Sequence, residues 1–116
     1  MIQDLGGGYI IDTRNDGTKY WHLNGKLHRT DGPAIEYSNG DREWFLNGVY
    51  HRVNGPAITC VSQYNYTAYY IHGKRHRLDG PAREWRELDE KEWYINNKEY
   101  TEEDYLVAIQ YPWMID

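Results

Sequence analysis

His28-Arg29-Thr30-Asp31-Gly32-Pro33-Ala34 returns twice in this sequence, as His51-Arg52-Val53-Asn54-Gly55-Pro56-Ala57 and as His76-Arg77-Leu78-Asp79-Gly80-Pro81-Ala82. We call this seven-residue motif the phrase. Its three copies begin at residues 28, 51 and 76, so the intervals are 23 and then 25 residues. A phrase that returns at a nearly fixed interval is typical of an architecture in which one small unit is copied along the chain.

A second pattern recurs in step with the phrase. It consists of Trp21-His22-Leu23-Asn24-Gly25, Trp44-Phe45-Leu46-Asn47-Gly48, Tyr69-Tyr70-Ile71-His72-Gly73 and Trp93-Tyr94-Ile95-Asn96-Asn97. The chain therefore contains three full units and a fourth that begins in the same way and ends differently. Terminal repeats commonly depart from the pattern because they cover an open end of the stack.

The second pattern predicts a series of β-hairpins. Asn-Gly between alternating aromatic segments favours a two-residue type I′ turn, and His72-Gly73 is a weaker version of it. With two-residue loops, counting back from Asn47-Gly48 pairs Leu46 with Val49, Phe45 with Tyr50, Trp44 with His51 and Glu43 with Arg52. The same count pairs Trp21 with His28, Tyr69 with His76 and Trp93 with Tyr100.

Alternation of side chains along a strand then predicts two faces. The face expected to be packed carries Trp21, Leu23, His28, Trp44, Leu46, His51, Tyr69, Ile71, His76, Trp93, Ile95 and Tyr100. The face expected to be open carries Tyr20, His22, Arg29, Glu43, Phe45, Tyr50, Arg52, Tyr70, Arg75, Arg77, Glu92 and Tyr94. We expect the second face to be a mixed aromatic and arginine surface.

The fold class expected from these patterns is an all-β repeat, an antiparallel meander of β-hairpins with a short C-terminal capping helix. Thr101 as N-cap, with Asp104 three residues later, predicts the start of that helix. We expect one domain over residues 1–116, made of an N-terminal half-repeat (1–17), hairpin repeats (18–100) and a helical cap (101–116). The N-terminal edge near Tyr9-Ile10-Ile11 is expected to be open to pairing.

Composition narrows the class of protein. With 116 residues, 13.9 kDa and a formal net charge of −5, the chain predicts one small domain without long-range attraction to nucleic acid or an anionic membrane. Its first eight residues contain no basic start and no apolar run, so no export signal is expected. The lone Cys60 excludes an internal disulfide and favours a reducing compartment, so a cytoplasmic location is expected.

The repeats resemble MORN (membrane occupation and recognition nexus) repeats, which stack β-hairpins into an elongated, curved sheet. A closer resemblance is to small proteins of tailed bacteriophages and large DNA viruses that repeat Asn-Gly-x-x-His-Arg-x-Asp-Gly-Pro-Ala. Residues 24–34, 47–57 and 72–82 match that phrase, with Asn54 in place of Asp and His72 in place of Asn. The resemblance covers residues 18–105 and implies a viral accessory protein that works inside a host cell, in the host cytoplasm.

No catalytic or metal-binding pattern stands out, and neither a cofactor nor enzymatic activity is expected. Histidines at equivalent positions lie about two strand spacings apart, roughly 9 to 10 Å, which is too far for one shared metal. A packed cross-strand role is therefore expected for the histidines of the phrase. The arginines of the phrase either brace the following Asp or Asn or contact a ligand, and bracing is the favoured interpretation.

The candidate binding face consists of Phe45, Tyr50, Arg52, Tyr70, Arg75 and Arg77. Arginine beside aromatic planes suits a ligand that bears phosphate and stacks its base. Broad repeat sheets favour a protein partner instead. The sequence therefore predicts a binding module that inhibits a host protein, and a component of antiviral defence is the expected target. The two alternatives are a sponge for a nucleotide-derived immune signal and an oligomeric structural component.

Overall fold

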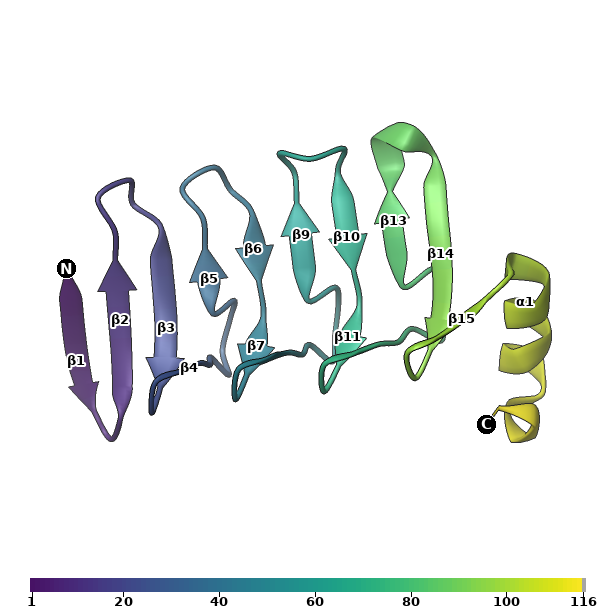
Figure 1. The fold of residues 1–116 in the computed structure, drawn as a ribbon, viewed down its shortest axis with the longest axis horizontal. Helices are drawn as coiled ribbons and strands as arrows, with labels where there is room; N and C mark the ends of the chain where they lie inside the picture. The colour runs from purple at the N-terminus through teal and green to yellow at the C-terminus, as the bar shows by residue number, and fades with distance from the viewer. Residues whose placement is uncertain (116) are drawn as a thin grey trace.

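The protein is a row of short antiparallel strands that runs from the N-terminus at one end to a helix at the other (Figure 1). The structure, a computed structural model, describes residues 1–115. Its dimensions of 49 × 31 × 17 Å are those of a thin slab. The predicted all-β meander with a short C-terminal helix is confirmed.

The strands form one long sheet and two short hairpins below it. In spatial order the sheet contains β1 (Ile2–Gly6), β2 (Tyr9–Thr13), β3 (Lys19–Leu23), β5 (Ile35–Glu36), β6 (Arg42–Glu43), β9 (Ile58–Cys60), β10 (Tyr66–Ala68), β13 (Arg83–Trp85), β14 (Glu90–Ile95) and β15 (Lys98–Tyr100), with β4 (Lys26–Leu27) paired to β3. The short hairpins are β7 (Phe45–Leu46) with β8 (Val49–Tyr50) and β11 (Tyr70–Ile71) with β12 (Lys74–Arg75). The helical elements are η1 (Arg86–Leu88), α1 (Glu102–Gln110) and η2 (Pro112–Met114).

The predicted two-residue turns are confirmed by the backbone. Asn47 and Gly48 have φ of 50° and 81°, and His72 and Gly73 have φ of 48° and 78°, as a type I′ turn requires. Phe45 pairs with Tyr50, and Leu46 with Val49, in the predicted register. In the last unit the pairing of Trp93 with Tyr100 is also confirmed.

The predicted pairing of Glu43 with Arg52 is wrong, because the strand changes partners at Trp44. The Trp44 carbonyl still accepts the His51 N–H at 3.1 Å, while the Trp44 N–H donates to Ala57 at 2.7 Å. Beyond that point Glu43 lies opposite Ile35 and Ile58 in the long sheet. The hairpin ladder therefore ends at Trp44 and His51, and the chain leaves it before Arg52.

The core does not lie where simple alternation predicts. One cluster combines the buried Ala34, Ile35 and Phe45 with the half-buried Tyr20, Leu27, Tyr37 and Tyr50. Phe45 is only 8% exposed, although it belongs to the face that was expected to be open. The alanines that close the phrase, Ala34, Ala57 and Ala82, are completely buried. The division into one packed face and one open face is therefore wrong for Phe45, and also for Tyr94, which is only 6% exposed.

The C-terminal helix closes one end of the sheet as predicted. The Thr101 side chain accepts the Asp104 N–H at 3.1 Å and so caps α1. Tyr105 and Ala108 form a second buried cluster with Ile95. Leu106 in the same helix is 55% exposed. The predicted cap over 101–116 ends at residue 116, which lies outside the described residues.

The opposite end of the sheet is formed by β1. The expected edge near Tyr9-Ile10-Ile11 is wrong, because β2 lies between β1 and β3 and pairs with both. All five residues of β1 are exposed. Within residues 1–115, no helix is long and apolar enough to cross a membrane.

Candidate functional site

Each phrase arginine (Arg29, Arg52 or Arg77) places its guanidinium over the ring of the aromatic residue that begins its own unit. The Cζ atoms are 4.0 Å from the Trp21 ring, 3.8 Å from the Trp44 ring and 4.0 Å from the Tyr69 ring, in the range of a cation–π contact. Each Nη1 also donates to the carbonyl of the phrase proline at 3.1 Å. The arginines therefore share a side with these aromatics, and the prediction that they lie on the opposite face is wrong.

The phrase glycine leaves room for this stack. A Cβ placed on Gly55 would lie 3.0 Å from Arg52 Cζ, and one placed on Gly32 would lie 2.9 Å from Arg29 Cζ. Contacts this short force one of the two groups to move. The guanidinium thus lies between the aromatic ring on one side and the glycine backbone on the other.

Each phrase histidine (His28, His51 or His76) joins its unit to the next. The Nδ1 atom accepts a backbone N–H from the first turn residue of the following hairpin: Asn47 to His28 at 2.9 Å, His72 to His51 at 2.9 Å and Asn96 to His76 at 3.0 Å. This bond requires an unprotonated Nδ1. Burial lowers the pKa of His51, with a further contribution from neighbouring His72, and burial also lowers the pKa of His76.

The predicted backbone pairing of each phrase histidine within its own hairpin is confirmed. The His28 N–H donates to the Trp21 carbonyl at 3.0 Å, and the His76 N–H donates to the Tyr69 carbonyl at 3.1 Å. The following arginine N–H then crosses to the next unit, as Arg52 donates to the Tyr70 carbonyl at 3.1 Å. One histidine–arginine pair therefore holds two consecutive hairpins together.

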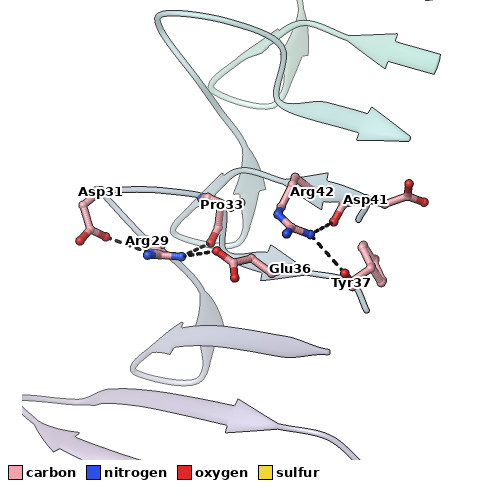
Figure 2. A network of polar contacts seen from close by, with 7 residues as sticks. All are labelled: Arg29, Asp31, Pro33, Glu36, Tyr37, Asp41 and Arg42. Atoms are coloured by element: carbon pink, nitrogen blue, oxygen red, sulfur yellow. Dashed lines mark hydrogen bonds and ion pairs between the residues drawn. The ribbon is translucent and has the colours of Figure 1, made fainter. Parts of the chain in front are cut away.

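The predicted bracing of the turn is confirmed in two of the three units. Arg29 Nε donates to Asp31 at 2.9 Å, and Arg77 Nε donates to Asp79 at 2.8 Å. Arg29 also forms an ion pair with Glu36 at 3.1 Å, and Figure 2 shows its guanidinium between Asp31, Pro33 and Glu36.

The second unit differs, because Asn54 stands where the others have Asp. Within residues 1–115, the Arg52 side chain has one hydrogen bond, to the Pro56 carbonyl, and no ion pair. Burial lowers the pKa of Arg52. Arg52 is therefore the phrase arginine that the fold leaves without a carboxylate.

The six residues of the candidate binding face do not form one surface. Phe45, Tyr50 and Tyr70 lie in a row of tilted ring contacts, with ring centroids 4.3 and 5.0 Å apart. The Tyr50 hydroxyl donates to Glu43 at 2.8 Å, and burial together with this carboxylate raises the pKa of Tyr50. Phe45 is buried, Tyr50 packs against the cluster that contains Phe45, and Tyr70 is half-buried.

Arg75 is also engaged within the structure. Its Nε donates to Asn97 at 3.0 Å, its Nη1 donates to the Tyr94 hydroxyl at 3.2 Å, and its Cζ lies 4.3 Å from the Tyr94 ring. Only Arg52 and Arg77, of the six, line the grooves described next. The sequence-based face therefore separates into a row of three aromatics, Arg75 bonded to Asn97 and Tyr94, and two arginines that line the grooves.

Two equivalent grooves lie between consecutive units. The first, of about 620 Å³, is lined by Trp44, Leu46 and His51, and the second, of about 590 Å³, is lined by the equivalent Tyr69, Ile71 and His76. Arg52, Val53 and Asn54 line both grooves and so form the ridge between them. Arg29 flanks the first groove and Arg77 flanks the second.

The ridge of Arg52, Val53 and Asn54, and the equivalent ridge of Arg77, Leu78 and Asp79, each carry an exposed apolar side chain that was not predicted from the sequence. Val53 is 74% exposed and Leu78 is 52% exposed. Both occupy the variable position after His-Arg in the phrase, where the first unit has Thr30. The position after His-Arg faces solvent in each copy. An apolar residue at that position is the signal that would have identified Val53 and Leu78.

The remaining candidates have structural explanations. The Cys60 thiol in β9 is half-buried, and burial with nearby Asp41 raises its pKa to about 11, so the reactive thiolate is disfavoured. No group of three or more His, Cys, Asp or Glu side chains among residues 1–115 is arranged to hold a metal ion.

A second exposed apolar region, which was not predicted from the sequence, lies at the C-terminal end, where Trp113 is 78% exposed.

Comparison with known proteins gives no assignment. No family model, curated protein or solved structure matches this chain. The site must therefore be interpreted from its own geometry.

Proposed function

We propose that this protein is a non-enzymatic binding module that occupies and blocks a protein of a host cell, as its resemblance to repeat proteins of phages and large DNA viruses implies. A component of antiviral defence is the proposed target. The face of the two grooves, with the ridge of Arg52, Val53 and Asn54 at its centre, is the proposed contact surface.

The observation that carries this proposal is the ridge-and-groove face itself. It offers apolar side chains at Val53 and Leu78 beside arginine stacked on aromatic rings. Arginine and aromatic residues are enriched at the centres of protein interfaces, where part of the surface is apolar and part forms hydrogen bonds. The grooves are open and lie side by side, which suits an extended protein surface.

A nucleotide sponge has weaker support. That function would use Arg52, Arg75, Arg77, Phe45 and Tyr70 as ligand contacts, but Phe45 is buried and Arg75 is bonded to Asn97 and Tyr94. A base would also have to displace the guanidinium that already covers Trp44.

The oligomeric alternative has one specific observation in its favour. The edge strand β1 is exposed along its whole length, whereas α1 packs against β14 and β15 near the other end. An open edge is a template for pairing with another chain. Pairing through β1 would leave the ridge-and-groove face free, so it is compatible with the main proposal.

The test is affinity purification of the tagged protein from phage-infected bacteria, followed by native and then denaturing mass spectrometry. We expect a host protein in stoichiometric amount, and we expect this protein to be lost when Val53 and Leu78 are both replaced by Asp, provided that the variant remains folded by circular dichroism. A small phosphorylated ligand released only on denaturation would contradict the proposal and support the nucleotide sponge.

A further inference from the structure

We propose that Arg52 accepts a carboxylate from an acidic segment of the partner protein, in the place that Asp31 and Asp79 fill for the neighbouring arginines. This inference rests on the proposed function for the kind of partner. It names Arg52 as the contact residue, a carboxylate as the group that Arg52 binds, and Asn54 as the residue that leaves this position open.

The three copies of the phrase place their arginines at equivalent positions inside one molecule. All three phrase arginines stack on an aromatic ring and donate to a proline carbonyl with the same geometry. Arg29 and Arg77 additionally donate from Nε to a carboxylate two residues later, at 2.9 and 2.8 Å. Asn54 replaces that carboxylate in the central unit, and Arg52 Nε has no such bond within residues 1–115.

The guanidinium of Arg52 is therefore positioned but not neutralised. Trp44 and the Pro56 carbonyl hold its plane, so little side-chain freedom remains to be lost when a ligand binds. A guanidinium has five N–H donors in a fixed fork, and within residues 1–115 only the Nη1 of Arg52 has a hydrogen-bond partner. A carboxylate can accept two parallel hydrogen bonds from such a fork.

The surroundings favour an acidic protein segment. Arg52 lies on the ridge shared by both grooves, beside Val53, which is strongly exposed. The Trp44 ring and Leu46 line one groove, and Tyr69 and Ile71 line the other. In a segment with apolar residues next to an Asp or Glu, the apolar residues would fill a groove and the carboxylate would bind Arg52.

The charge balance favours one carboxylate over a phosphate group. Asp31 and Asp79 stand on the adjacent ridges, and the whole chain has a net charge of −5. A doubly charged phosphate would be repelled more strongly by these charges than a singly charged carboxylate. The position vacated by the Asn54 substitution is also one that the neighbouring units fill with a carboxylate oxygen.

The test uses the purified full chain, labelled with ¹⁵N, and a capped Leu-Glu-Leu peptide as probe, because this peptide carries one carboxylate between two apolar residues. The arginine Nε–Hε resonances are followed during titration, and inorganic phosphate is titrated separately. We expect the Arg52 resonance to shift and saturate with the peptide, and to respond less to phosphate. Failure of the Arg52 resonance to respond to the peptide would overturn the inference, as would tighter binding of phosphate.

Two variants make the test specific. Asn54→Asp supplies the missing carboxylate from within, as the flanking units do, so it should fold normally and weaken peptide binding about tenfold or more. Asp79→Asn should open the same position beside Arg77 and make that resonance respond to the peptide as well. Equal peptide affinity of Asn54→Asp and the wild type would contradict the site.

These outcomes separate the inference from the proposed function. If Asn54→Asp still captured the stoichiometric host protein with unchanged affinity, the carboxylate site would be wrong and the binding function would stand. If the peptide bound at Arg52 and no host protein were captured, the site would stand and the proposed function would fail.

Discussion

The phrase histidines connect consecutive units through an unprotonated ring nitrogen. His51 and His76 have pKa values lowered by burial from the ordinary value of 6.5, so the folded protein binds these protons less readily than the unfolded chain. Their contribution to stability is therefore complete above about pH 6.5 and declines as the pH falls through the lower folded values.

We accordingly predict a lower urea midpoint at about pH 5.5 than at about pH 7.5, a range in which exposed carboxylates remain ionised. Replacing both His51 and His76 by Gln should lower the midpoint at neutral pH and reduce its dependence on pH. Equal midpoints for the wild-type protein at both pH values would rule out this role for the histidines.

The phrase glycine is predicted to be required for the arginine stack. Gly55→Ala would place a Cβ 3.0 Å from Arg52 Cζ, so the guanidinium would have to shift by a few tenths of an ångström in its contact with the Trp44 ring. The expected loss is about 1 kcal/mol in the free energy of unfolding, measured by urea denaturation. Val53→Ala at the exposed neighbouring position is the matched control and should change stability little. A Gly55→Ala protein as stable as that control would contradict the stack.

At the scale of elements, α1 is attached to the third copy of the phrase through one hydroxyl. The Tyr105 hydroxyl donates to the Arg77 carbonyl at 2.7 Å and accepts the Gly80 N–H at 3.2 Å. Tyr105 is fully buried, so Tyr105→Phe should leave both backbone groups without their partner. The helix thus replaces the next hairpin as the neighbour of this phrase.

We predict that Tyr105→Phe lowers the free energy of unfolding by about 1–3 kcal/mol. Thermal and urea denaturation measure the change, and Tyr111→Phe on the same C-terminal segment is the matched control. An unchanged midpoint for Tyr105→Phe would show that packing alone attaches the cap.

The elements that the sequence predicted well are those set by local rules. The Asn-Gly and His-Gly turns demand positive φ at adjacent residues, and that requirement fixed both the hairpins and their register. The N-cap at Thr101 is likewise a contact with a residue three positions later. Such features need no knowledge of the rest of the fold.

The side of the hairpin to which the phrase arginines turn their side chains was not predictable from the same local rules. Side-chain alternation holds only while a strand continues, and the chain leaves the hairpin ladder between His51 and Arg52. The Arg52 side chain then turns back over Trp44 instead of pointing away from it. The buried position of Phe45 was missed for a related reason, since its neighbours Ala34 and Ile35 come from the preceding unit.

At the scale of the whole molecule, the phrase makes each unit depend mainly on its neighbours. Deleting residues 44–68 removes one period and joins Glu43 to Tyr69, so that Arg29 N–H can reach the Tyr70 carbonyl and His28 can accept the His72 N–H. Stability in such arrays is approximately a sum of unit and interface terms. We predict a folded, shorter protein with one cooperative urea transition at a lower midpoint. A chain without a cooperative transition would contradict this nearest-neighbour organisation.

The slab presents the ridge-and-groove face at one end of its strands and a different set of turns at the other. In Figure 1 the phrase segments run along the lower side, whereas the connection from β9 to β10, which contains Val61, lies at the top. Val53 and Val61 are both exposed valines. They therefore form a matched pair for locating the contact surface.

The most direct measurement is site-specific photo-crosslinking in phage-infected bacteria, with p-benzoylphenylalanine in place of Val53 or of Val61. We predict one discrete protein adduct from position 53, weakened by Asn54→Asp on the same chain, and no matching adduct from position 61. No adduct from position 53, or the same adducts from both positions, would contradict the claim that this protein binds its partner through the ridge between the two grooves.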